Sequence, residues 1–215
     1  KEGTQILING GIEEARLDAW LLLEYTADIT RAWYYAHMDD GLDAKTEERY
    51  RTLCTKRAQH IPLQHITGRA YFMGYEFCVD ERVLVPRQDT EVLVEEAISR
   101  MRNLEKPQIL DMCTGSGCIL ESILKFAERK GICVSGAVFI QGDLFENIAE
   151  TYDMIVSNPP YIRTEEISSL EDEVKLHDPW IALDGKTDGL YFYRLIVKES
   201  VKHIKKGGYL LFETG

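Results

Sequence analysis

The nine residues Met154–Ile162 combine an apolar run with a rigid polar turn, in the order Met-Ile-Val-Ser-Asn-Pro-Pro-Tyr-Ile. The run Met154-Ile155-Val156 is typical of a short strand that is buried on both faces of a parallel sheet. Asn158-Pro159-Pro160 must end this strand, because proline has no N–H for a neighbouring strand and restricts the residue before it. We therefore expect a stiff turn at the end of a buried strand.

Such a turn can bind a planar NH2 group. The Asn158 side-chain oxygen and the Pro159 main-chain carbonyl can accept its two hydrogens, and the Tyr161 ring can stack on it. Asn158, Pro159, Pro160 and Tyr161 are therefore candidate catalytic residues and candidates for binding the substrate. A proline-rich loop after a core strand is the alternative, but Asn-Pro-Pro-Tyr is far more specific than Asn-Pro alone.

A second polar turn follows the apolar pair Ile109-Leu110. The segment Asp111–Gly117 has the sequence Asp-Met-Cys-Thr-Gly-Ser-Gly and precedes an apolar helix that we expect from about Cys118 to Arg129. Strand, glycine-rich turn and helix in this order bring backbone amides close to a ligand. The three-glycine dinucleotide fingerprint is absent, and Asp111 suits a bound cation better than a pyrophosphate. A sulfonium-bearing amino acid with a free ammonium group is such a cation.

Composition and charge restrict the class of protein. The chain has 215 residues, of which 45% are hydrophobic and 28% charged, as in an ordinary globular protein of one or two domains. Its net charge of −11 disfavours long nucleic acid as a direct partner. No apolar run of membrane-spanning length and no N-terminal signal are present, which predicts a cytoplasmic protein without a membrane partner. Five cysteines without Cys-x-x-Cys spacing predict neither disulfides nor a metal site.

The residues before the two turns predict a separate helical domain. Residues 1–66 carry only helical signals, including a helix from about Asp43 to His60 and a short one capped by Thr30. This part contains no catalytic cluster. Residues 67–85 are rich in glycine and aromatic side chains, and their alternation of exposed and buried positions predicts a connecting hairpin. Residues 86–215 then form the domain that carries both turns.

These motifs resemble those of class I S-adenosylmethionine-dependent methyltransferases that act on amino groups. The wider pattern resembles the release factor glutamine methyltransferase family of the HemK type, over nearly the whole chain. That pattern comprises Pro86–Glu91, Asp111–Gly117, Gln141–Phe145, Asn158–Ile162 and the segment from Asp178 to Leu190. The resemblance implies an α/β fold, in which a Rossmann-like class I methyltransferase sheet has helices on both faces. A small all-helical N-terminal domain that engages the protein substrate and a connecting β-hairpin precede this sheet.

The resemblance also implies a reaction. Members of the family transfer a methyl group from S-adenosyl-L-methionine to the side-chain amide nitrogen of a glutamine. That glutamine lies in the Gly-Gly-Gln motif of class I peptide chain release factors. We expect a monomer that needs no metal. Carried over to matching positions, the cofactor-binding residues are Asp111, Cys113, Thr114, Gly115, Ser116, Gly117, Asp143, Leu144 and Asn158. Arg87 and Thr90 join residues 158–161 as substrate-binding residues.

The sequence departs from the family pattern after the first helix of the methyltransferase domain. Gly131–Gly136 and Ala137–Ile140 resemble its second and third strands, yet no residues remain between them for a crossover helix. We expect that a segment is missing after Gly136 and that the final hairpin of the sheet is missing as well. The acid that binds the cofactor ribose therefore has no candidate. Leu144 stands where many family members have an aromatic ring near the adenine.

The segment 164–189 is long and acidic, and we expect a solvated loop or a lid over the substrate. We expect His177 in this segment to be structural rather than a general base. In the helix that follows, the spacing of Leu190, Tyr193, Val197 and Val201 predicts a face packed on the sheet.

Two other functions remain open at this stage. An adenine N6 methyltransferase acting on DNA or RNA would use the same Asn-Pro-Pro-Tyr chemistry, because adenine presents a similar planar NH2 group. A noncatalytic module would bind the cofactor without transferring its methyl group.

Overall fold

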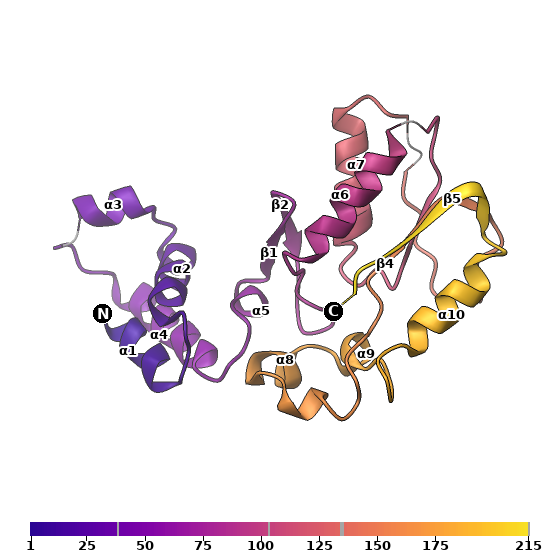
Figure 1. Ribbon diagram of the computed structural model, residues 1–215. Coiled ribbons are helices and arrows are strands. Elements are labelled where there is room, and N and C mark those ends of the chain that lie inside the picture. The colour runs from indigo at the N-terminus through magenta and orange to yellow at the C-terminus, as the bar shows by residue number, and fades with distance from the viewer. Residues whose placement is uncertain (38, 103, 134–135, 215) are drawn as a thin grey trace.

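The computed structural model describes residues 1–37, 39–102, 104–133 and 136–214. In Figure 1 the chain begins with a group of helices and passes through a small hairpin into a sheet flanked by helices. The N-terminal helices are α1 (Glu2–Asn9), α2 (Ala15–Ala27), α3 (Arg31–Ala36), α4 (Ala44–Arg57) and α5 (Leu63–Thr67). Within the described residues, no helix combines the length and apolar character needed to cross a bilayer.

Local capping explains where two of these helices begin. The Thr30 hydroxyl accepts a hydrogen bond from the Trp33 amide, and the Asp43 carboxylate accepts from the first amides of α4. Both caps confirm the sequence prediction. The helical part has an apolar core of its own, formed by Leu7, Ile12, Ala15, Ala19, Leu22 and Cys54.

A buried arginine connects this helical part to a segment far along the chain. Arg57, at the end of α4, donates from Nε to Asp18 at 2.6 Å, and its Nη2 lies 2.7 Å from a carboxylate oxygen of Glu173. Glu173 belongs to α8 (Asp172–His177), which follows the Asn-Pro-Pro-Tyr turn. The pairing therefore joins the helical part to the segment next to that turn.

The predicted hairpin is confirmed. Strands β1 (Arg69–Phe72) and β2 (Tyr75–Cys78) pair antiparallel, and a tight turn with positive φ at Met73 (52°) and Gly74 (76°) joins them. The Met73 amide donates to the Glu91 carboxylate at 2.6 Å, which anchors the hairpin to α6 (Thr90–Met101).

The sheet of the second part consists of β3 (Ile109–Met112), β4 (Tyr152–Ser157) and β5 (Ile204–Phe212), paired in parallel in that order. Met154, Ile155 and Val156 in the central strand are fully buried, as the sequence predicts. Met154 and Val156 pack against α6 and α7 (Cys118–Arg129). Ile155 packs on the other face with side chains of α10 (Tyr191–Ser200). Helices thus cover both faces of the sheet (Figure 1).

Two apolar runs that resemble strands stay outside the sheet. In the part of the chain that the structure describes, neither Gly131–Cys133 nor Gly136–Gln141 forms a strand, and residues 134 and 135 lie outside it. Val138 and Phe139 are each 79% exposed. The physical reason is the missing connection, because a parallel pair needs a crossover of a dozen or more residues.

The predicted packing face of α10 is confirmed at one of its four positions and wrong at the other three. The Tyr193 ring packs edge-on against Phe212 of β5, with centroids 5.1 Å apart. Leu190 is the N-cap and is exposed, as are Val197 and Val201. The helix packs mainly through Phe192 and Ile196, which are four residues apart and lie on the same face. Its sequence is apolar on several sides, so spacing alone did not decide which side packs. The remaining short helices are η1 (Ile167–Ser169) and α9 (Trp180–Leu183).

The buried arginine gives a test of the helical part. We expect Arg57→Ala to lower the free energy of unfolding by roughly 3–5 kcal/mol, because it leaves the buried Asp18 carboxylate without its partner. Arg51→Ala in the same helix removes only exposed ion pairs with Glu2 and Glu47, and should lower the free energy of unfolding far less. Urea denaturation of both variants measures the difference, and equal losses would contradict the structural role of Arg57.

Candidate active site

The parallel register of β3 and β4 brings the two polar turns to one edge of the sheet. Asp111 lies beside Val156, and Met112 lies beside Ser157. The Ser157 hydroxyl donates to the Met112 carbonyl at 2.7 Å and joins the two strand ends. The glycine-rich turn and the Asn-Pro-Pro-Tyr turn therefore leave the sheet next to each other.

The glycine-rich turn has a backbone that only glycine adopts easily. Gly115 and Gly117 have φ of 53° and 79°, and a Cβ built on either would meet no atom within 4 Å. Gly117 precedes the first residue of α7, and its amide donates to the Thr114 carbonyl at 2.8 Å. The turn thus leaves open space in front of the positive end of a long helix, where a ligand can approach the backbone.

Asp111 is the charged group beneath this turn. Its Oδ2 accepts hydrogen bonds from the Thr114 hydroxyl at 2.7 Å and from the Leu120 amide at 3.3 Å. Its Oδ1 is buried and has no hydrogen-bond partner among the described residues. Burial raises the pKa of Asp111 to about 6, although these two hydrogen bonds lower it in part. A buried acceptor without a partner fits a ligand that brings a cationic N–H donor.

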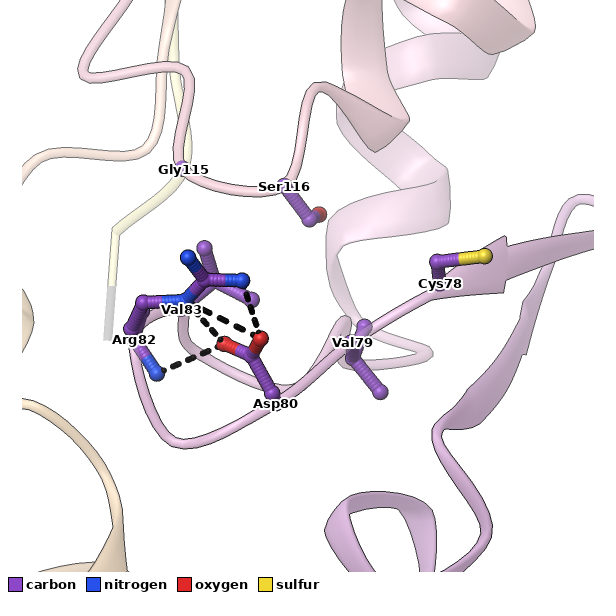
Figure 2. Close-up of a pocket in the computed structure, with 7 residues that line it drawn as sticks. All are labelled: Cys78, Val79, Asp80, Arg82, Val83, Gly115 and Ser116. Carbon is purple, nitrogen blue, oxygen red and sulfur yellow. Dashed lines mark hydrogen bonds and ion pairs between the residues drawn. The ribbon is translucent and has the colours of Figure 1, made fainter.

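A hollow of about 430 Å³ lies between the glycine-rich turn and the segment after β2 (Figure 2). In Figure 2, Gly115 and Ser116 lie across from Asp80 and Arg82, which form an ion pair with each other. The segment after the hairpin therefore forms the opposite wall of the space next to the turn. The sequence alone did not indicate this wall. The residues that line the hollow on both sides are Cys78, Val79, Asp80, Arg82, Val83, Gly115 and Ser116.

Three other predicted cofactor residues lie near the ends of the same strands. Cys113 follows β3 with φ of 62°, and its thiol lies against Ser157. Cys113 is exposed as a residue, but neighbouring groups desolvate its thiol, which raises the pKa of the thiol to about 11, and the Asp111 and Asp143 carboxylates add to the shift. Asp143 is exposed and close to that thiol, whereas Leu144 is half-buried against the core that contains Ile155.

The Asn-Pro-Pro-Tyr turn is packed from the side of α6. Pro159 and Pro160 are buried, and the Asn158 Nδ2 donates to the hydroxyl of the buried Thr90 at 3.4 Å. Within the described residues, Oδ1 of Asn158 has no hydrogen bond. Thr90 and Asn158, two of the predicted substrate-binding residues, are therefore in contact.

Arg87 approaches the turn from another direction. Its Nη2 donates to Oδ2 of the buried Asp178 at 2.8 Å. Burial raises the pKa of Tyr161, and the nearby Arg87 guanidinium opposes this shift. Arg87 and Tyr161 thus lie near each other, and the arginine ties the segment 164–189 to the site. His177 in that segment approaches the Gln59 carbonyl at 3.3 Å, and so faces the helical part.

Two glycines pack closely against the backbone of Tyr161. A Cβ at Gly185 would lie 2.7 Å from the Tyr161 Cα, and one at Gly189 would clash with the Tyr161 carbonyl oxygen. The Gly185 amide also donates to the Ile162 carbonyl at 2.8 Å. Sequence analysis missed this support, although the Asp-Gly pairs at 184–185 and 188–189 are a signal for tight turns.

Glu213 is a further site residue that sequence analysis missed. It follows β5, and its amide donates to the Ser157 carbonyl at 3.1 Å, which places it beside Asn158. Among the described residues, no group of three or more His, Cys, Asp or Glu side chains is arranged to hold a metal ion.

The buried carboxyl of Asp111 predicts a pH-dependent stability. Unfolded Asp111 loses its proton near pH 4, and folded Asp111 holds it until about pH 6, so the folded state binds more protons in between. Its contribution to the free energy of unfolding therefore falls by on the order of 3 kcal/mol as the pH rises through this window. Urea denaturation of wild type and Asp111→Asn at several pH values measures this, and parallel profiles would contradict it.

Comparison with known proteins places the chain in a family. Residues 1–68 match the family described as the PrmC N-terminal domain. The release factor glutamine methyltransferase of Geobacter sulfurreducens is 38% identical over 97% of this chain and 80% of its own length. The proteins of the same name from Clostridium acetobutylicum and Chlorobaculum tepidum are 36% and 35% identical, and the matches cover 92% and 94% of this chain and 78% and 79% of those proteins.

The alignment to one relative is longer than this chain. The match to the Geobacter protein runs over 232 positions, more than the 215 residues of this chain. That relative therefore carries residues inside the matched region that this chain lacks.

The identity and coverage of these matches show that the chain belongs to the release factor glutamine methyltransferase family.

Proposed function

We propose that this protein transfers a methyl group from S-adenosyl-L-methionine to the glutamine side-chain amide nitrogen in the Gly-Gly-Gln motif of class I peptide chain release factors. The observation that carries the proposal is the meeting of two turns at neighbouring strand ends. One turn has open space and a buried carboxylate oxygen, Asp111 Oδ1, that has no hydrogen-bond partner among the described residues. The other has an amide oxygen, Asn158 Oδ1, that accepts no hydrogen bond from those residues.

The chemical difficulty lies in the substrate. The lone pair of an amide nitrogen is delocalised into the carbonyl, so the nitrogen is a weak nucleophile. Asn158 Oδ1 and the Pro159 carbonyl accept the two N–H groups, orient the nitrogen and stabilise the positive charge that develops on it. As the N–CH3 bond forms, the S–CH3 bond breaks and S-adenosyl-L-homocysteine is the leaving group. No strong base is needed beforehand, because the N–H proton becomes acidic only as the new bond forms and is then lost to water.

The residues of the glycine-rich turn suit the methyl donor. S-adenosyl-L-methionine supplies a methyl group on a positively charged sulfur and also carries a free ammonium group. Asp111 Oδ1 is suited to accept from that ammonium group, and Gly115 and Gly117 leave the backbone open to it. Cys113, Thr114, Ser116, Asp143 and Leu144 complete the proposed cofactor site.

The helical part is proposed to bind the release factor. The proposed boundaries are residues 1–66 for this helical domain, 67–85 for the connecting hairpin and 86–215 for the methyltransferase domain. Arg87 and Thr90 are proposed to support the substrate glutamine from the side of α6. The cytoplasmic location, the monomeric state and the lack of a direct nucleic-acid partner stay predictions.

The first test removes the amide acceptor. We expect Asn158→Ala to lower kcat by about 100-fold or more, because a group that stabilises developing charge is lost, while cofactor affinity changes little. Mass spectrometry of a release factor incubated with the enzyme and methyl donor measures the transfer. Lys198→Ala, at an exposed position of α10 outside the site, is the control.

The same assay separates the alternatives. Methylation of adenine in DNA or RNA instead of release factor would favour the N6 methyltransferase, and cofactor binding without any transfer would favour a noncatalytic module. Equal losses of kcat and cofactor affinity in Asn158→Ala would contradict the proposed role of Asn158.

A second test concerns the cofactor ammonium group. We expect S-adenosyl-L-methionine to bind more weakly as the pH falls below about 6, because the protonated Asp111 no longer carries the charge that attracts the ammonium group. Isothermal titration between pH 5 and pH 7.5 measures this. Asp111→Asn should bind weakly at every pH, and an unchanged affinity in this variant would argue against the contact.

A further inference from the structure

The ends of β4 and β5 place a carboxylate directly beside the proposed amide-binding asparagine. The register pairs Ser157 with Phe212, so the next residues in each strand, Asn158 and Glu213, are neighbours. The Glu213 amide donates to the Ser157 carbonyl at 3.1 Å, and its carbonyl accepts from the Tyr193 hydroxyl at 2.7 Å. Main-chain contacts on both sides therefore hold Glu213 in place.

The side chain of Glu213 lies among polar neighbours and is partly withdrawn from water. Its Oε2 is buried and has no hydrogen-bond partner among the described residues. Burial raises the pKa of this carboxyl, and the nearby Thr90 and Asn158 side chains lower it in part. Thr90 also accepts from the Asn158 Nδ2 at 3.4 Å. Asn158, Thr90 and Glu213 thus form one connected polar group.

The chemistry of this group selects one orientation of the Asn158 carboxamide. An ionised carboxylate only accepts hydrogen bonds, so it attracts the NH2 end of an amide and repels the oxygen end. If the amide were turned by 180°, its oxygen would face the carboxylate and its NH2 would face the substrate. A donor in that position could not accept the N–H groups of a glutamine side chain.

We propose that Glu213 is a positioning residue, which holds the NH2 of Asn158 toward Thr90 and itself and so keeps Asn158 Oδ1 available to accept from the substrate amide. This inference rests on the proposed function, since it assigns Glu213 a role in that reaction. Glu213 acts through Asn158 and does not itself need to touch the substrate.

Other titratable groups surround the carboxylate. Asp89, just before α6, raises the pKa of Glu213 further. Tyr161 and Tyr193 face it from the turn after β4 and from α10, and the Glu213 carboxylate contributes to the raised pKa of each phenol. Both tyrosines stay neutral in the acidic range. Asp89 is therefore the only acidic neighbour of Glu213 among these groups. At saturating cofactor, the loss of activity on acidification therefore reports the protonation of Glu213.

The experiment compares Glu213→Gln, Glu213→Asp and the exposed control Glu165→Gln in release factor methylation. The glutamine variant has nearly the same shape but can donate as well as accept, so it no longer selects one orientation of Asn158. We expect kcat to fall about 10- to 100-fold in Glu213→Gln, while the Kd for S-adenosyl-L-methionine stays within about twofold of the wild type. Glu213→Asp keeps the charge and should recover part of the activity.

The pH profile of kcat at saturating cofactor supplies a readout that a purely structural role would not move. The wild type should lose activity on acidification, starting above the ordinary pKa of a glutamate, and this acid limb should disappear in Glu213→Gln. An unchanged kcat and pH profile in Glu213→Gln would overturn the inference, as would equal losses in the glutamine and aspartate variants. If the wild type itself fails to methylate release factors, the proposed function fails instead.

Discussion

The site depends on one constraint, the parallel pairing of β3, β4 and β5. Strands that run in the same direction end at the same edge of the sheet, so the residues after each strand become neighbours. Here those residues are the glycine-rich turn after Met112, the Asn-Pro-Pro-Tyr turn after Ser157, and Glu213 after Phe212. The apolar cores on both faces of β4 fix this register, because a shift by one residue would exchange the side chains that pack on the two faces.

Three buried carboxylate oxygens without hydrogen-bond partners lie around this edge, among the residues that the structure describes. They are Oδ1 of Asp111, Oδ1 of Asp178 and Oε2 of Glu213, and burial raises the pKa of all three carboxyls. Such groups cost free energy in the folded protein. Asp111 and Glu213 lie at or just after strand ends, and Asp178 is paired with Arg87. Such a group of carboxylates is typical of a site where bound groups, rather than the protein itself, supply the missing donors.

The sequence predicted the elements whose signals are local. The apolar run before Asn158 predicted the central strand, and Thr30 and Asp43 predicted helix starts. Three features escaped because they depend on contacts between distant parts of the chain. Glu213 joins Asn158 only through strand register, and Gly185 supports Tyr161 from a loop 24 residues further along. The face of α10 was mispredicted at three of its four positions because its sequence is apolar on several sides, so that the sheet decides which side packs.

The double pairing of Arg57 has a mechanical consequence. The Arg57 guanidinium binds Asp18 inside the helical part and Glu173 in α8 outside it. A single side chain therefore links these two parts of the protein. Any tilt of the helical part that separates it from α8 must stretch a charge contact within a poorly hydrated environment. The position of the helical part is therefore coupled to that of α8, which ends at Asp178, the partner of Arg87. A force on the outer helices would therefore reach Asp178 and, through it, Arg87 near Tyr161.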